Sequence, residues 1–280
     1  MCETIGFVDF EKITHAEPKW YMGYSDNTNF TFLQTTLCDT AAIYGSCVAT
    51  FGMDTWHKAL HDAFALLTGK ATDNVKGEAA DITDKMTGEV QDDISFILSG
   101  YDGWEKESLK SEENPTAVWN ITEPTVIKAY RGNDPAADEE ITFLGRLLGG
   151  CMDCLVNLLG TKYDKVKEFN KKYENDGVVW FLESCDLNVF SIRRAMWQMK
   201  NAGWFDTAKG FIIGRPLVFG QEIMGLDQYS AVIGIVGDMG LPVIMDVDLG
   251  HLAPTMPIIS GSIGKVSVKG NDFAVEMKLK

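Results

Sequence analysis

The chain has 280 residues, 45% hydrophobic and 23% charged, a composition typical of a globular protein that buries a core in one or two domains. Its 25 basic and 40 acidic residues give a formal net charge of −15, which argues against binding to nucleic acid or to an anionic membrane. We find no apolar stretch of about 18–20 residues and no secretion signal. Six scattered cysteines do not form a disulfide framework, which favours a reducing cytoplasm.

Residues 1–70 are predicted to form a partial α/β domain. An apolar run at residues 19–24 indicates a strand, and the polar residues after it can cap a helix with apolar side chains at helical spacing. Residues 41–53 indicate a second short strand with a loop, and residues 54–69 indicate a second helix. The features of this second helix are a cap at Asp54, an end at Gly69 and an apolar stripe of Trp56, Leu60, Phe64 and Leu67.

Residues 71–140 have a different texture from the segments on either side. They are polar, acidic and rich in turn-forming residues, with glycine and proline between short apolar patches. We therefore expect a long acidic connection or insertion between two better-packed parts of the chain.

Residues 141–280 are predicted to form a C-terminal α/β domain, because apolar strands alternate with helices. Residues 141–150 lead into an expected helix at residues 151–161, and a second helix is expected at residues 191–203. The expected strands or strand-like runs are residues 178–183, 209–216, 230–237 and 241–251. Residues 264–280 alternate in polarity on both sides of Gly-Asn-Asp and indicate a terminal β-hairpin.

The tetrapeptide Gly23-Tyr24-Ser25-Asp26 lies at the predicted corner between a strand and a helix. Several enzymes expose a serine nucleophile at such a corner. A serine nucleophile needs a base within hydrogen-bond reach, usually histidine, and a carboxylate that holds the imidazole in the right tautomer. The corner is not the G-x-S-x-G elbow of α/β-hydrolases, because Asn27 stands at the position of the second glycine.

Four histidines are candidates for the base. His15 lies in a polar segment, and His57 and His61 are expected to face solvent from the helix at residues 54–69. His251 instead follows an apolar strand on a glycine-containing loop, where α/β proteins place reactive groups. The pattern alone leaves a catalytic role and a structural role open for His251.

Other polar residues stand where apolar ones are expected. Glu183 ends an apolar strand, either to cap nearby backbone amides or to orient a histidine. Cys151 and Cys154 have the spacing of half a zinc site, but without a second pair two cysteines facing the core are the simpler interpretation. Asp246 and Asp248 alternate along a strand and give weak evidence for a cation site.

Together these features resemble the LD-carboxypeptidase family, the serine peptidases that comprise muramoyl-tetrapeptide carboxypeptidases and microcin C immunity peptidases. The resemblance runs in order from about residue 17 to the C-terminus, interrupted at residues 71–140. The segments that carry it are PKWYMGYSDNTNFTF, RLLGGCMDCLVNLLGT, VVWFLESCDLNVFSIRRAMWQMKNAGWF, FIIGRP and LPVIMDVDLGHLAPTMPIISG.

The resemblance implies a role for each residue of the site. Ser25 matches the nucleophile, Glu183 the acid of a Ser–His–Glu triad and His251 the general base, while the backbone N–H of Asp26 gives one oxyanion donor. The expected reaction is hydrolysis of an amide next to a D-residue in a murein tetrapeptide, or of a peptidyl- or aminoacyl-nucleotide antibiotic. The family implies a cytoplasmic homodimer that needs no metal or cofactor.

The sequence departs from the family pattern in three ways. Only 22 residues precede Gly23, so we expect that a family segment carrying the second oxyanion donor is missing. Cys151, after Gly150, stands where the family usually has asparagine. The acidic connection is long, and it contains Trp104 and Trp119, which could line a substrate site or hold a loop in place by packing. The residues expected to contact substrate are Tyr24, Trp104, Trp119, Gly150 and Cys151. The missing segment leaves open an impaired or non-catalytic homologue that only binds a peptide or nucleotide.

Overall fold

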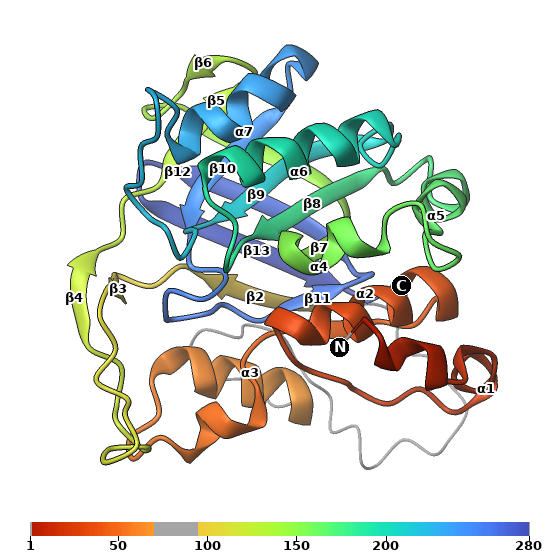
Figure 1. Cartoon of the computed structure of the whole chain (residues 1–280), viewed down its shortest axis with the longest axis horizontal. Coiled ribbons are helices and arrows are strands. Elements are labelled where there is room, and N and C mark those ends of the chain that lie inside the picture. The colour runs from red at the N-terminus through yellow and green to blue at the C-terminus, as the bar shows by residue number, and fades with distance from the viewer. Residues whose placement is uncertain (1, 70–94, 280) are drawn as a thin grey trace.

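The structure is a computed structural model that describes residues 2–69 and 95–279 (Figure 1). A nine-stranded mixed sheet forms its centre, and helices cover the sheet, which confirms the predicted α/β class. The order of the strands across the sheet is β2 (Ser95–Ser99), β13 (Asp272–Lys278), β12 (Ile263–Lys269), β7 (Glu140–Cys151), β8 (Val178–Glu183), β9 (Ala208–Gly214), β10 (Pro242–Val247), β5 (Lys128–Arg131) and β6 (Asp134–Pro135).

Strands β7 to β10 run parallel to one another and form the middle of the sheet. Both of their faces are covered, so their sequences are almost continuously apolar. In β8 the side chains of Val179 and Phe181 enter one hydrophobic core, and those of Trp180 and Leu182 enter the core on the opposite face. One apolar strand thus serves two cores, because successive side chains point to opposite faces of a sheet.

Four helices connect the parallel strands, and Figure 1 shows α6 and α7 lying across them. They are α4 (Met152–Leu158), α5 (Val166–Lys172), α6 (Val189–Asn201) and α7 (Gln228–Val236). In α6 the predicted apolar residues Ile192, Met196 and Met199 are buried, and the Asn188 side chain caps its first turn. No helix in the described ranges is long and apolar enough to cross a membrane.

Helix α7 corrects the strand predicted at residues 230–237. The Asp227 side chain accepts a hydrogen bond from the Ser230 N–H at 2.7 Å and so caps the helix. Ala231, Val232 and Val236 are buried in the same core as Trp180. A short run of valine and isoleucine cannot distinguish a buried strand from a buried helix by periodicity, and here packing on the sheet decides.

The N-terminal part packs against both faces of the sheet. Helix α2 (Thr28–Cys38) contributes Phe32 and Leu33 to the core on the α6 side. Strand β1 (Ala42–Tyr44) pairs with β11 (Ile258–Ser260), and α3 (Lys58–Thr68) lies with β1 in the other core. The remaining elements are 3-10 helices η1 (Thr4–Phe7), η2 (Ser25–Asn27), η3 (Val48–Gly52) and η4 (Gly237–Met239), and α1 (Phe10–His15).

Two details of the N-terminal prediction are wrong. Residues 19–24 do not form a regular strand, and only Met22 makes an isolated bridge, to Ile43. Helix α3 is capped by His57 instead of Asp54, because the His57 Nδ1 accepts the Ala59 N–H at 3.1 Å. His57 therefore does not simply face solvent.

The described part of the predicted connection, residues 95–140, contains strands of the main sheet. Strand β2 forms one edge of the sheet, and β5 and β6 form the other. Strands β3 (Gly103–Glu105) and β4 (Ile121–Pro124) pair with each other beside the sheet (Figure 1). The sequence concealed these strands because they are short, and all of them except β3 are partly exposed. Residues 70–94 lie outside the described residues. The predicted hairpin is confirmed as β12 and β13.

Candidate active site

Three chain segments meet at the carboxyl end of the parallel strands. Glu183 is the last residue of β8, and His251 lies on the loop after β10. Ser25 begins η2, at the entrance to α2. Open α/β sheets bind their ligands at this end of the strands.

The three predicted side chains form one line of hydrogen bonds. The Nε2 of His251 lies 2.9 Å from the Oγ of Ser25, and its Nδ1 lies 2.8 Å from the Oε2 of Glu183. A carboxylate only accepts hydrogen bonds, so the Nδ1 carries a proton and the Nε2 is left to accept the Ser25 hydroxyl proton. This arrangement can activate the serine oxygen as a nucleophile.

Tyr44, on β1, completes the surroundings of Glu183 and was not anticipated from the sequence. Its hydroxyl donates to the Oε1 of Glu183 at 2.5 Å, and both side chains are fully buried. Burial, and secondly the charge of Glu183, hold the pKa of Tyr44 well above its usual value, so the phenol keeps its proton. The same oxygen accepts the N–H of Ser25 at 3.4 Å.

The pKa of His251 lies above its usual value of 6.5. Burial acts to lower it, but the hydrogen bond and the negative charge of Glu183 outweigh burial. Gly250 lets this loop approach the carboxylate, because a Cβ there would lie 2.6 Å from the Oε2 of Glu183.

The backbone at Ser25 adopts a left-handed conformation, with φ of 60°. In α/β-hydrolases a sharp, strained turn at the nucleophile likewise exposes its side chain. Asn27 stabilises the turn, since its Oδ1 accepts the Tyr21 hydroxyl at 2.6 Å and its Nδ2 donates to the Tyr24 carbonyl at 3.2 Å. Gly23 is required because a Cβ there would lie 2.6 Å from the Asn27 side chain. Asn27 thus has a structural role where the hydrolase elbow has glycine.

The end of β7 forms the next part of the site. Gly150 has φ of 141°, and a Cβ there would lie 2.6 Å from the Thr28 side chain. The Thr28 hydroxyl accepts the Cys151 N–H at 3.0 Å, which joins the start of α2 to β7. Cys151 and Cys154 are buried, and the Cys154 thiol donates to the Ser25 carbonyl at 3.6 Å.

Cys151, Glu183 and His251 are the group of described residues that could hold a metal ion. Their ligand atoms lie within 4.8 Å of one another. A hydrogen bond with Cys154, then burial and the charge of Glu183, raise the pKa of the Cys151 thiol far above its usual value. A metal would have to displace that proton and the hydrogen bonds between Glu183 and His251. This chemistry favours the proton-transfer line over a metal site.

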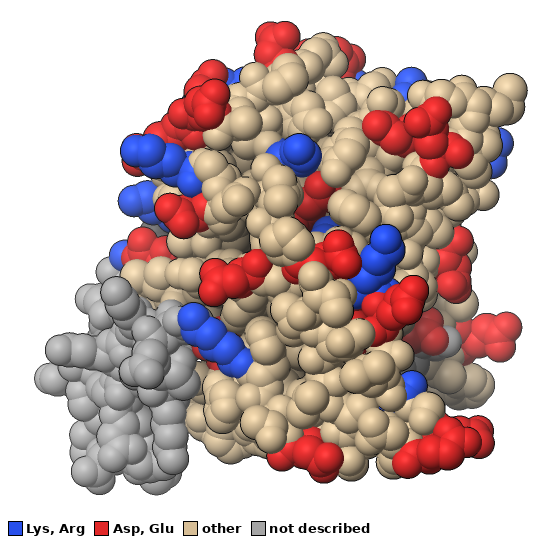
Figure 2. All heavy atoms as spheres, turned by 90° about the vertical axis from the view of Figure 1, so that its left-hand side faces the viewer, with Lys and Arg blue, Asp and Glu red and all other residues tan. Residues whose placement is uncertain are grey.

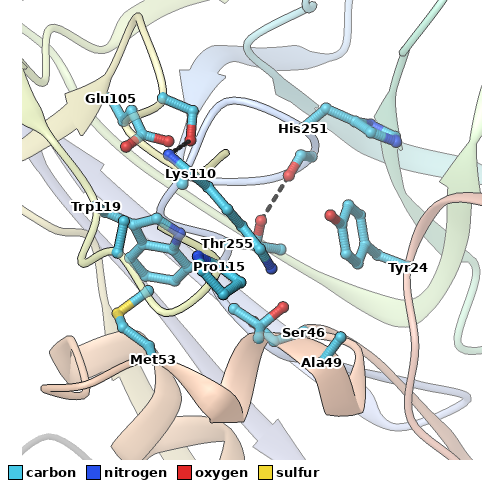
Figure 3. Close-up of a pocket in the computed structure, with 15 residues that line it drawn as sticks. Tyr24, Ser46, Ala49, Met53, Glu105, Lys110, Pro115, Trp119, His251 and Thr255 are labelled. Atoms are coloured by element: carbon cyan, nitrogen blue, oxygen red, sulfur yellow. Dashed lines mark hydrogen bonds between the residues drawn. The ribbon is translucent and has the colours of Figure 1, made fainter. Parts of the chain in front are cut away.

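The expected substrate residues lie in different surroundings. Tyr24 and Trp119 line a cavity together with His251, and the rings of Tyr24 and His251 are 5.0 Å apart (Figure 3). Trp104 does not line this cavity; it is buried against Phe219, with 5.0 Å between ring centroids.

The two aspartates considered for a cation are satisfied inside the protein. Asp246 accepts hydrogen bonds from Gln228 at 3.1 Å and from Tyr229 at 2.6 Å. Asp248 forms an ion pair with Arg215, and both side chains are almost fully buried. These contacts account for the two carboxylates without a cation.

Comparisons with known proteins identify the family of the chain. Residues 1–45 match the model of the LD-carboxypeptidase N-terminal domain, and residues 144–266 match that of the C-terminal domain. None of the curated proteins matches the chain. The fold and the site define an α/β protein of the serine-peptidase type. The chain belongs to the LD-carboxypeptidase family, as the sequence resemblance predicted.

Solved structures with the same fold include proteins described as MccF-like. One from Bacillus anthracis str. Ames has a TM-score of 0.69 and 16% identity, covering 99% of this chain and 72% of that one. Another, from Streptococcus pneumoniae in complex with AMP, has a TM-score of 0.65 and 19% identity, covering 98% of this chain and 74% of that one. MccF in complex with glutamyl sulfamoyl guanosine has a TM-score of 0.67 and 16% identity, covering 100% and 72%.

Proposed function

We propose that this chain is a serine peptidase that hydrolyses an amide with Ser25 as nucleophile, His251 as general base and Glu183 as the acid that orients the base. The observation that carries the proposal is the continuous hydrogen-bond line from the Ser25 Oγ through His251 to Glu183. No metal or cofactor has a role in the proposed reaction.

The reaction begins when the Nε2 of His251 takes the Ser25 hydroxyl proton and the oxygen attacks the scissile carbonyl. Glu183 stabilises the imidazolium that forms. His251 then donates the proton to the leaving amine, and a water molecule hydrolyses the acyl-enzyme with the same base.

The negative oxygen that develops on the substrate carbonyl needs hydrogen-bond donors. We assign one to the backbone N–H of Asp26, which directly follows the nucleophile at the start of η2. Loss of one such donor costs about 3–4 kcal/mol of transition-state stabilisation.

Two substrate classes fit the family. One is a peptide with an amide next to a D-residue, such as a murein tetrapeptide, and the other is a peptidyl- or aminoacyl-nucleotide. The second is favoured by the complexes of MccF with glutamyl sulfamoyl guanosine and of the Streptococcus pneumoniae protein with AMP. The homodimeric state and the cytoplasmic location remain proposals that rest on the family. The alternative is a homologue that binds such ligands without turnover.

Replacing the nucleophile tests the proposal. Ser25→Ala is expected to lower kcat by several orders of magnitude on an L,D-tetrapeptide or an aminoacyl sulfamoyl nucleoside, because among the described residues only the Ser25 hydroxyl bonds to the Nε2 of His251. Release of the amino acid or nucleoside is measured by chromatography, and circular dichroism checks the fold. Ser99→Ala, at an exposed serine of β2, is the matched control. Undiminished hydrolysis by Ser25→Ala would refute the assignment. Binding without turnover by the unaltered chain would favour the alternative.

A further inference from the structure

A cavity of about 210 Å³ lies beside His251 and has no role in the proton-transfer line (Figure 3). Tyr24 and His251 form one side of it, and residues of the 105–119 segment form another. Cavities for drug-sized ligands measure about 300–1,000 Å³, so this one suits a group the size of a single small amino acid.

One wall of the cavity presents two hydrogen-bond donors, the amine of the exposed Lys110 and the hydroxyl of Ser46, for which the described residues provide no partner. The Lys110 side chain runs across the cavity, and its amine points toward Ser46 and Thr255 (Figure 3). Lys110 forms no ion pair with another described residue. Ser46 is 2% exposed, and its hydroxyl has no hydrogen bond to any described residue, whereas Thr255 already donates to the Gly250 carbonyl at 2.5 Å. An ammonium beside a free hydroxyl forms a receptor for a carboxylate.

A carboxylate also lines the cavity. Glu105 is 7% exposed, and its Oε2 accepts the Asn120 N–H at 2.6 Å. No lysine or arginine of the described residues forms an ion pair with Glu105. The cavity therefore contains one positive and one negative side chain that do not pair with each other, and a ligand with both charges can satisfy both.

We propose that, when the substrate is an L,D-peptide, this cavity binds the C-terminal amino acid that the reaction releases, with its α-carboxylate on Lys110 and Ser46 and its ammonium facing Glu105. The inference rests on the proposed function in one respect: His251 donates a proton to the leaving amine, so the leaving residue lies on the side of His251 that the cavity borders. In the substrate this residue has a free carboxylate and an amide nitrogen. Hydrolysis turns that nitrogen into an amine, which is protonated at neutral pH, so the product is a zwitterion.

The first experiment compares two substrates that differ only at the C-terminus. Wild type should hydrolyse an L,D-peptide ending in a free D-alanine carboxylate on the order of tenfold or more faster, in kcat/KM, than the corresponding C-terminal amide. Lys110→Met should abolish this preference, by slowing hydrolysis of the free carboxylate substrate much more than that of the amide. Lys106→Met, at an exposed lysine of the same segment, should keep the preference. If Lys110→Met keeps the preference or slows both substrates equally, the proposal is wrong.

The second experiment does not depend on turnover. D-alanine should bind to the Ser25→Ala protein, measured by ligand-detected NMR, and D-alaninamide should bind at least tenfold more weakly. Lys110→Met and Glu105→Gln should each weaken binding of D-alanine by tenfold or more. Binding of D-alanine to a chain that hydrolyses neither substrate class would contradict the proposed function and leave this site standing. Absence of D-alanine binding, or binding of AMP alone at Lys110, would overturn the site.

Discussion

At the scale of single residues, the contact between Tyr44 and Glu183 leads to a testable prediction about the pKa of His251. Its hydroxyl hydrogen bond offsets part of the negative charge on Glu183, and that charge in turn raises the pKa of His251. In the proposed mechanism Tyr44 is thus a positioning residue that acts through Glu183 and, by accepting the Ser25 N–H, through the turn that carries Ser25.

The pH profile of kcat/KM reports this coupling. Activity should rise with pH as His251 loses its proton, with a midpoint above 6.5, because the folded protein raises the pKa of this histidine. In Tyr44→Phe the carboxylate loses its donor and holds the imidazolium proton more strongly, so the midpoint should move to higher pH. Glu183→Gln should move it to lower pH. A purely structural role of Tyr44 predicts a lower rate with an unchanged midpoint, and that result would contradict the coupling.

The sequence identifies site residues where the local pattern is broken by a polar group. Glu183 was detectable because it ends an apolar strand, and His251 because it follows one directly. Tyr44 was not detectable, since an aromatic residue in a strand is ordinary and its partner Glu183 lies 139 residues away in the chain. The polar wall of the cavity was also missed, because Lys110 and Glu105 lie in a segment that looks like a charged connection.

At the scale of secondary-structure elements, α7 shows how a cap and packing outweigh residue preferences. Asp227→Ala removes the acceptor for the Ser230 N–H and should lower the free energy of unfolding by about 0.5–2 kcal/mol. Urea unfolding followed by circular dichroism measures the change, and Glu174→Ala at an exposed position is the control. Equal stability of Asp227→Ala and the control would mean that the sheet alone determines this helix.

At the scale of the whole molecule, a buried ion pair joins the 95–125 segment to the parallel strands. Besides Arg215, Asp248 accepts the Tyr101 N–H at 2.6 Å and the Thr125 hydroxyl at 3.3 Å. On the face shown in Figure 2, by contrast, acidic and basic side chains lie interspersed at the surface. Such exposed pairs contribute about 0–1 kcal/mol each.

Breaking the buried pair should therefore affect the fold much more than breaking a surface pair. Arg215→Met leaves the carboxylate of Asp248 buried without its cation and should lower the free energy of unfolding by about 3–5 kcal/mol. Adding Asp248→Asn should restore part of that loss, because the uncompensated charge is then gone. Glu168→Gln, which removes an exposed pair with Lys165, should change stability by less than about 1 kcal/mol. Urea unfolding of the three variants and the wild type measures these changes. Equal losses on breaking the buried pair and the surface pair would contradict this account.

Much of the fold was predictable where apolar strands alternate with capped helices, as in β8, α6 and β10. The described part of residues 71–140 was not, because short edge strands such as β2 and β5 gain their stability from neighbours distant in sequence. Local pattern contains little information about such pairing.

The single phenolic oxygen of Tyr44 touches both the backbone of the nucleophile and the acid that serves its base. Strand β1, which carries it, pairs in the described structure with a three-residue strand, β11. Lifting this small ribbon away would remove the Tyr44 contacts to the Ser25 N–H and to the Glu183 carboxylate in one movement. The surroundings of the proposed triad therefore depend on the docking of two three-residue strands, however stable the large sheet beneath them remains.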